Sequence, residues 1–278
     1  GRPDMVKLGV QFNEEDHDTV RKLKEALGAL EEYTFNYLDN HEDMADQLKA
    51  SPPQFVLNLC DEGYFNDALK ELHVPAMLDV LGIPYSGAAA ACLGMCYDKA
   101  LVRALASSLE IPVPLESYYD PDDQAATLPS VFPALLKPNL GDSSLGITAG
   151  SVVRSPEEFM SCWERLRGEF PDRPLLVQEF LEGSEFSVGI LGNPGQNVNV
   201  LPVLEVDYSN LDPNLPRILG YESKWMPDSP YWTQISYKQA TLKEEKRRAI
   251  VDASMILFER LGCRDYARFD FRADSEGI

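Results

Sequence analysis

The sequence lacks any apolar run long enough to cross a membrane, and its N-terminus carries no signal-like pattern. We therefore predict that the protein neither spans a membrane nor is secreted. Its five cysteines include no Cys-x-x-Cys pair, which favours reduced thiols and a cytoplasmic location. The three histidines, His17, His41 and His73, are scattered without ligand spacing, so no zinc site is expected.

Basic residues are also scarce. The chain has 25 Lys and Arg residues against 45 Asp and Glu residues, a formal net charge of −20. Such a chain repels nucleic acids and anionic membranes unless it has a local basic patch. The run Lys243–Arg248 is interleaved with glutamates in a predicted helix, which favours a solvated helix face. We therefore predict no nucleic-acid or membrane partner.

The 278 residues, 44% of them hydrophobic, are enough for two or three folded domains. The first part of the chain reads as strand, helix and strand over Val6–Val10, Asp18–Leu30 and Phe55–Leu59. A further turn-bounded strand covers Gly82–Gly87. This βαβ pattern predicts a parallel sheet, and we place the end of the first domain near residue 97.

The next segment combines two lysines with a glycine- and serine-rich loop. Asp98 is a predicted N-cap, with Lys99 in the first helical turn, either as a solvated lysine or as a phosphate ligand. A second lysine, Lys137, ends an apolar run and precedes a loop containing Asn139, Gly141, Asp142, Ser143, Ser144 and Gly146. Backbone amides and an ammonium group in this order suit a polyphosphate, although a hairpin turn with a surface lysine is the alternative.

Further along, Ser155–Glu158 is a capping-box pattern with proline at the first helical position, and Gly168 is the predicted end of that helix. Strands are predicted over Leu175–Phe180 and Phe186–Leu191. Strand segments that bracket a helix, with a glycine loop in the first hairpin, indicate a small α+β domain over roughly residues 98–184. Another strand is predicted over Val198–Val206.

The segment Asp207–Gln239 shows neither helical nor strand periodicity, which indicates a lid or binding loop, with a disordered linker as the alternative. A second capping-box pattern, Thr241–Glu244, opens a helix that ends at Gly262. The strand Tyr266–Arg272 follows, with Arg268 and Asp270 on one face. That face suits a phosphate and Mg²⁺, or else a structural ion pair.

Several of these segments resemble the ATP-grasp superfamily, and within it the D-alanine–D-alanine ligase group. The resemblance covers most of the chain and rests on the order and spacing of GIPYSG (82–87), YDKALVRALA (97–106), FPALLKPNLGDSSLGI (132–147), LVQEFLEGSEFSVGIL (176–191), YESKW (221–225) and LGCRDYARFDFR (261–272). It implies a mixed α/β and α+β ATP-grasp fold with an N-terminal parallel-sheet (pre-ATP-grasp) domain. The implied domains are residues 1–97, 98–184 and 185–278, with a mobile loop near 207–239.

The resemblance also implies a site between the sheets of the second and third domains. Lys99 and Lys137 would contact the α- and β-phosphates of ATP, and the Asp142–Ser144 loop would close over the γ-phosphate. The remaining implied roles are the adenine edge for Gln178, Glu179 and Leu181, the ribose for Glu185, the transferring phosphate for Lys224, the oxyanion of the tetrahedral intermediate for Arg268, and Mg²⁺ for Asp270.

The implied activity is that of an ADP-forming acid–amino-acid ligase, which joins a small carboxylate and an amine of the amino-acid class through an acyl phosphate. ATP and Mg²⁺ are the implied cofactors, with Mn²⁺ as an alternative metal, and the family suggests a homodimer. The alternative function is an ATP-binding protein without ligase activity.

Four departures from the ligase pattern stand out. The loop carries Gly141-Asp142 in place of an acidic residue followed by glycine, and Trp225 stands where tyrosine is common. Leu8–Asn13 lacks the glycine-rich substrate motif, and NLCDEG (58–63) stands in place of a histidine-glycine-acidic motif. Glu62 and Trp225 are the candidate substrate contacts. In the family, a following strand completes a two-metal site. Because the sequence ends at Ile278, we expect this form to bind nucleotide but to turn over weakly.

Overall fold

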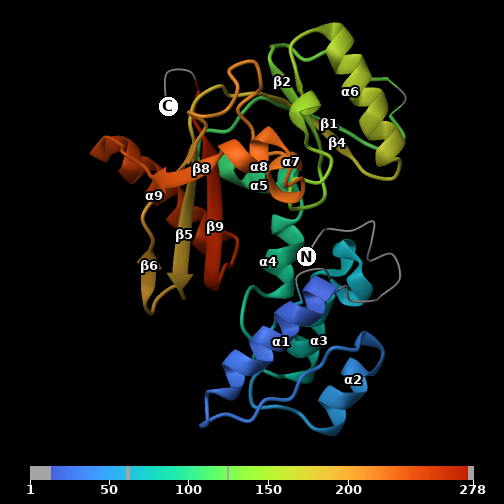
Figure 1. The fold of residues 1–278 in the computed structure, drawn as a ribbon, viewed down its shortest axis with the longest axis vertical. Helices are drawn as coiled ribbons and strands as arrows, with labels where there is room; N and C mark the ends of the chain where they lie inside the picture. The colour runs from blue at the N-terminus through green and yellow to red at the C-terminus, as the bar shows by residue number, and fades with distance from the viewer. Residues whose placement is uncertain (1–13, 61–62, 124, 275–278) are drawn as a thin grey trace. The chain divides into compact units, whose positions relative to one another are not determined.

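The computed structural model describes residues 14–60, 63–123 and 125–274 (Figure 1). Contacts within the chain separate two compact units, Gly1–Ser86 and Gly87–Ile278. The finer division at residues 97 and 184 stays a prediction. Within the described residues, no helix is long and apolar enough to cross a membrane.

The first unit is mainly helical in its described residues. It contains α1 (Glu14–Gly28), α2 (His41–Ala50) and α3 (His73–Leu81), with two short 3₁₀ turns, Tyr64–Asn66 and Ala68–Lys70, before α3. Its core consists of Met44, Leu48, Val74, Leu78, Ile83 and Tyr85.

The parallel sheet predicted for this unit is reduced, in the described residues, to one bridge between Val56 and Tyr85. The predicted strand over 55–59 was therefore too long, and the one over 6–10 lies outside the described residues. The first helix begins at Glu14 and ends at Gly28, whereas the periodicity had placed it over Asp18–Leu30.

The second unit opens with two helices, α4 (Ala90–Cys96) and α5 (Lys99–Ser108). The carboxylate of Asp98 accepts a hydrogen bond from the backbone N–H of Leu101 at 3.0 Å, which confirms the predicted N-cap. The cap fixes Lys99 as the first helical residue.

An antiparallel four-stranded sheet follows. Its strands are β1 (Glu116–Tyr119), β2 (Ala134–Pro138), β3 (Val152–Val153) and β4 (Leu175–Glu179), in the order β1-β4-β2-β3. Helix α6 (Pro156–Glu169) covers one face through Phe159, Cys162, Trp163 and Leu166.

The start of α6 differs in detail from a capping box. Ser155 caps the N–H of Glu158 as predicted, but the Glu158 carboxylate accepts from the N–H of Arg154, one residue before the cap. The helix also ends at Glu169, one residue past Gly168, because Gly168 has helical backbone angles.

The second sheet contains β5 (Glu185–Gly192), β6 (Val198–Val200), β7 (Leu204–Asp207), β8 (Ser236–Gln239) and β9 (Asp265–Arg272), all paired antiparallel. One strand was predicted over 198–206, but the segment forms two strands separated at Leu201–Val203, where Pro202 has no N–H for a ladder. Helix α9 (Glu244–Arg260) covers one face of this sheet through Leu257 and Phe258.

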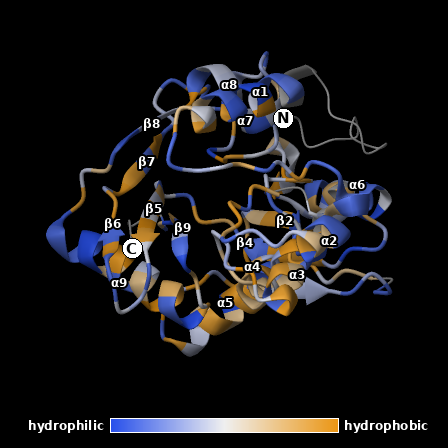
Figure 2. Cartoon of the chain, turned by 90° about the horizontal axis from the view of Figure 1, so that it is seen from below, coloured by the Kyte–Doolittle hydropathy of each residue, from blue (hydrophilic) through white to orange (hydrophobic). Residues whose placement is uncertain are grey.

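The predicted cap of α9 at Thr241 was wrong. The helix begins at Glu244 after Lys243, which makes no side-chain capping bond. Its end at Gly262, with φ +69°, agrees with the prediction. Figure 2 shows the first turns of α9 as strongly hydrophilic, as expected for the exposed Lys243–Arg248 run.

The segment after β7 is folded rather than irregular. It forms α7 (Glu222–Trp225) and α8 (Pro230–Gln234) and returns as β8. Tyr208, Leu211, Ile218 and Tyr231 from this segment form a core with Val152, Phe180 and Val206, which come from the two sheets and the link between them. Whether this segment is mobile stays a prediction.

Candidate functional site

The face of the first sheet opposite α6 is polar. The register pairs Glu116 with Gln178 and Lys137 with Leu176, so Glu116, Gln178 and Lys137 share this face. The Gln178 amide donates a hydrogen bond to the Glu116 carboxylate. Burial lowers the pKa of Lys137 to about 8, and the negative charge of Glu116 only partly opposes this shift.

The loop after β2 has an unusual backbone. Ser143 and Ser144 have φ values of +49° and +61°, a region that costs free energy for residues other than glycine. The loop is held in this shape from the other side of the site: the Ser144 hydroxyl donates to the carbonyl of Leu219 at 2.8 Å, and the Trp225 indole N–H donates to the carbonyl of Ser143 at 3.2 Å. The segment after β7 therefore fastens the loop.

Lys99 reaches the same loop from the start of α5. Its ammonium group donates to the carbonyls of Asn139 at 3.1 Å and Gly141 at 2.5 Å. The fully buried Asn139 locks this arrangement, because its amide accepts from the N–H of Ala100 at 2.9 Å and donates to Asp98 at 2.9 Å. Burial, and then the positive charge of Lys137, lowers the pKa of Lys99 to about 7.

The second sheet also has one polar face. The apolar side chains of Ala267, Phe269 and Phe271 pack against the core below α9, as predicted, so Arg268 and Asp270 lie on the opposite face. The Arg268 guanidinium donates to both Asp270 oxygens, at 2.9 and 3.0 Å. The Ser187 hydroxyl, on neighbouring β5, donates to Asp270 Oδ1 at 2.7 Å.

Glu185 lies at the edge of that face in a network of its own. Its Oε2 accepts from Tyr208 Oη at 2.6 Å and from Arg272 Nη1 at 2.7 Å. The Arg272 guanidinium also donates to the carbonyls of Leu181 and Arg217 and lies over the Phe180 ring, 4.4 Å from its centroid. Burial, and then the charge of Glu185, raises the pKa of Tyr208, which therefore stays a hydrogen-bond donor.

Lys224 on α7 interacts electrostatically with charged residues of the second sheet and of the loop after β2. Burial lowers its pKa, and the positive charge of Arg268 adds to the effect. The charges of Asp270, Asp142 and Glu185 act in the opposite direction. The ammonium group of Lys224 therefore lies close enough to both the polar face of the second sheet and the loop after β2 for their charges to affect its pKa.

Three lysines of the site are not neutralised by a directly paired carboxylate among the described residues. Within the described part of the chain, Lys99, Lys137 and Lys224 form no ion pair with a carboxylate, and burial lowers the pKa of each. A bound polyanion would remove this deficit, so the residues fit a polyphosphate. Asp270 offers a single carboxylate that is hydrogen-bonded to Arg268 and Ser187, so it fits Mg²⁺ only if Arg268 releases it and phosphate oxygens supply further ligands.

Other residues expected from the sequence have mixed positions. Gln178 is buried on the polar face, whereas the Glu179 carboxylate accepts from the N–H of Leu115 at 3.3 Å. The carbonyl of Leu181 is occupied by Arg272. Glu62 lies outside the described residues. No sequence pattern pointed to Glu116, Ser187 or Tyr208, and Arg272 was named only as the end of the predicted strand Tyr266–Arg272.

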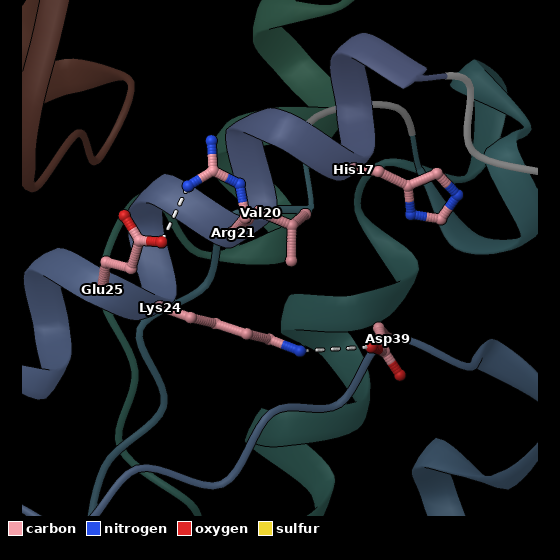
Figure 3. A pocket seen from close by; sticks show the side chains of 6 residues that line it. All are labelled: His17, Val20, Arg21, Lys24, Glu25 and Asp39. Atoms are coloured by element: carbon pink, nitrogen blue, oxygen red, sulfur yellow. Dashed lines mark hydrogen bonds and ion pairs between the residues drawn. The ribbon is translucent and has the colours of Figure 1, made fainter.

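Neither of two surface hollows is lined by Lys99, Lys137 or Lys224. The larger of two, about 570 Å³, lies on α1 and is lined by His17, Val20, Arg21, Lys24, Glu25 and Asp39 (Figure 3). Its charges pair with one another, Arg21 with Glu25 at 2.7 Å and Lys24 with Asp39 at 3.7 Å. A second hollow of about 210 Å³ lies beside β7 and includes Ser184, Glu205 and Lys238. The candidate site is therefore identified by its converging lysines.

Comparison with known proteins assigns the family. Residues 122–278 match the family model described as "D-ala D-ala ligase C-terminus". The uncharacterised protein y4sG of Sinorhizobium fredii is 31% identical over 209 residues, covering 74% of this chain and 57% of that protein. A D-alanine–D-alanine ligase of Halalkalibacterium halodurans is 30% identical over 207 residues, covering 73% of this chain and 63% of that protein. The chain thus spans about three fifths of the length of these curated relatives.

A solved structure agrees on the fold. The D-alanine–D-alanine ligase from Bacillus anthracis, complexed with ATP, superposes with a TM-score of 0.68 at 20% sequence identity, covering 96% of this chain and 80% of that one. This likeness shows the ATP-grasp fold and confirms the fold class expected from the sequence. By its family model and its fold, the chain belongs to the ATP-grasp D-alanine–D-alanine ligase-like family.

Proposed function

We propose that the protein binds ATP between its two sheets and activates a small carboxylate for attack by an amine. The observation that carries this proposal is the convergence of Lys99, Lys137 and Lys224, which lack ion pairs among the described residues, on one loop and one polar sheet face. In a chain with a net charge of −20, a concentration of unneutralised ammonium groups favours an anionic ligand.

The proposed nucleotide contacts follow from these positions. Lys99 and Lys137 bind the α- and β-phosphates, and the loop Asp142–Ser144 covers the γ-phosphate. Lys99 must exchange its present carbonyl partners, Asn139 and Gly141, for phosphate oxygens. We assign the adenine edge to Gln178 and the backbone of Glu179 and Leu181, and the ribose hydroxyls to Glu185.

The proposed chemistry has two steps. A substrate carboxylate oxygen attacks the γ-phosphorus, ADP leaves, and an acyl phosphate forms. An amine then attacks the acyl carbon, phosphate leaves, and the amine gives up a proton. Lys224 neutralises charge on the transferring phosphoryl group, and Arg268 stabilises the oxyanion of the tetrahedral intermediate. Asp270 would hold Mg²⁺ or Mn²⁺, which supplies charge neutralisation between phosphates.

The family relationship supports small amino-acid-like substrates. The Halalkalibacterium halodurans relative and the Bacillus anthracis structure are described as D-alanine–D-alanine ligases, but the Gly141-Asp142 order and Trp225 differ from the usual ligase pattern. Trp225 donates to the Ser143 carbonyl, so here it contributes to the loop's shape. D-alanine itself is therefore not part of the proposed substrate assignment.

The test is ADP release by the purified protein with ATP, Mg²⁺ and a panel of amino acids. We expect release only when both an acid and an amine acceptor are present, with one amide formed per ADP. ADP release that is independent of any acceptor would contradict the ligase proposal.

A second candidate is nucleotide binding without ligation. The observation in its favour is that both Asp270 oxygens are occupied by Arg268, the residue assigned to the oxyanion. In this case ATP binds and remains intact with every member of the panel. The two candidates therefore differ in product formation and agree on ATP binding.

A further inference from the structure

Three cysteines of the second unit lie together at a place that the proposed reaction does not use. Cys92 and Cys96 are four residues apart on α4, so they lie on one face of the helix. Cys263 follows α9 and precedes β9. The Cys92 sulfur lies 3.7 Å from that of Cys263 and 3.9 Å from that of Cys96, and all three sulfurs lie within 4.8 Å of one another.

These distances match those between ligands of one metal ion. Zn²⁺–thiolate bonds are about 2.3 Å long, which puts neighbouring sulfurs of a tetrahedral site about 3.8 Å apart. A disulfide would need about 2.05 Å and would leave the third sulfur unused. The five cysteines are all described, and none forms a disulfide. The arrangement therefore suits coordination by three sulfurs better than pairing of two.

The burial of the cluster leaves one side accessible. Cys92 and Cys263 are buried, with 3% and 6% of their surface exposed, whereas Cys96 is exposed. Three protein ligands with an exposed fourth position are the arrangement of an open zinc site, in which water or another ligand completes the tetrahedron.

We propose that Cys92, Cys96 and Cys263 form a binding site for a thiophilic metal ion of the Zn²⁺ class, with one coordination position open to solvent. The ion ties α4 to the start of β9. Two residues separate the end of helix α4 from α5, which begins with Lys99, and β9 carries Arg268 and Asp270. The tie therefore connects two elements that bear candidate phosphate-site residues, although the metal site does not depend on the proposed ligase function.

The sequence alone argued against zinc because no ligand spacing was visible. Cys92 and Cys263 are 171 residues apart and meet only when α4 packs against the sheet and helix of the second unit. Packing of three small side chains in a core is the alternative, and it requires no metal.

The test is a titration of the reduced 278-residue chain with Co²⁺ and then Zn²⁺, in the presence of a phosphine reductant. We expect one ion per chain, with a thiolate-to-cobalt charge-transfer band that Zn²⁺ abolishes, and Zn²⁺ retention against a chromophoric chelator. Cys92→Ser and Cys263→Ser should each lower the affinity by more than about 100-fold, since the loss of an outer-shell partner alone costs about 10- to 100-fold. Cys60→Ser, in the first unit, is the matched control and should bind as the wild type does.

A second readout needs no variant. Zn²⁺ should protect Cys92, Cys96 and Cys263 of the wild-type chain from alkylation, as measured by peptide mass spectrometry, while Cys60 reacts equally with and without metal. The proposal is overturned if the reduced wild type binds no ion, if Cys263→Ser binds normally, or if the cluster responds only to oxidants by forming a disulfide.

Discussion

At the scale of the residue, the central feature is the free-energy cost of burying the charged ammonium groups of Lys99 and Lys137. Lys99 and Lys137 have lowered pKa values because burial disfavours their charged forms and, for Lys99, because another lysine is near. A bound polyphosphate would therefore stabilise the charged forms of these two side chains, which burial disfavours in the free protein. Structural lysines are normally solvated or paired, so this arrangement is typical of a binding site.

Proton uptake on nucleotide binding follows from Lys99. Because its pKa is about 7 in the free protein, it is largely neutral at pH 8.5, and a phosphate beside it should restore the charge. Lys137, with a pKa of about 8, contributes in the same way, so we expect ATP binding at pH 8.5 to take up between about one and two protons more than at pH 6 and to weaken as the pH rises. Calorimetry in buffers of different ionisation enthalpy measures this, and Lys99→Met should remove roughly half of the difference.

The same pKa has a consequence for stability. Between pH 7 and the ordinary lysine pKa of 10.5, the unfolded chain binds a proton at Lys99 that the folded chain does not. Lys99 therefore makes the free energy of unfolding rise with pH in this window. Denaturant unfolding of the wild type and Lys99→Met should show a shallower rise in the variant. An unchanged slope would mean that Lys99 is solvated.

At the scale of the element, the loop between β2 and the short β3 strand owes its shape to contacts on both sides. Lys99 and Asn139 fix its first half, while Leu219 and Trp225 fix the serines. Gly146 closes the loop with φ +74°, and a Cβ there would lie 2.7 Å from Phe170 and 2.9 Å from Pro138. These contacts preorganise the loop in a conformation that an isolated peptide would not adopt stably.

The substitution Gly146→Ala tests this description. Strain at positive φ and the close contacts should lower the free energy of unfolding by about 1–3 kcal/mol. The control is Gly168→Ala, an exposed helical position with no atom within 4 Å of the new Cβ, which should raise it by about 0.5–1 kcal/mol. Denaturant unfolding measures both. A neutral Gly146→Ala variant would show that the loop adapts freely.

Elements with their own local signals were predictable from the sequence. The Asp98 cap, the end of α9 at Gly262 and the alternation of Arg268 and Asp270 with apolar residues all depend on a few neighbouring residues. The helices α7 and α8 were missed because, at four and five residues, they are too short to show a periodic pattern. Helix α8 contributes Tyr231 to the core with Tyr208, Leu211 and Ile218, which forms only in the folded chain.

The candidate site was predictable to a similar extent. Motif order indicated Lys99, Lys137, Lys224, Arg268 and Asp270. The partners that position them were not visible, because Glu116 meets Gln178 only through the pairing of β1 with β4, 62 residues apart. Tyr208 likewise reaches Glu185 across two strands. Such contacts depend on sheet register, which a single sequence does not show.

At the scale of the whole molecule, the second unit is two sheets joined by the segment from Tyr208 to Ile235. The segment supplies the shared core and fastens the loop after β2, and it carries Lys224. Release of this segment would open the region between the two polar faces. We therefore expect it to be the part of the second unit that nucleotide binding stabilises most.

Hydrogen exchange with and without MgATP tests that expectation. Peptides covering residues 208–235 should exchange at least about tenfold more slowly with nucleotide, whereas the core strand β5 should change little. Equal protection of both regions would indicate general stabilisation of the fold and contradict a closing segment.

Nucleotide binding should depend on Lys99, Lys137 and Lys224, which form no ion pair with a carboxylate among the described residues. The most direct measurement is the calorimetric affinity for MgATP of the wild type, Lys137→Ala and Lys22→Ala, the last an exposed lysine on α1. We predict that Lys137→Ala lowers the affinity by about 10- to 100-fold, the equivalent of one charged hydrogen bond, and that Lys22→Ala leaves it unchanged. Equal affinity of all three proteins, or no binding by the folded wild type, would contradict the account.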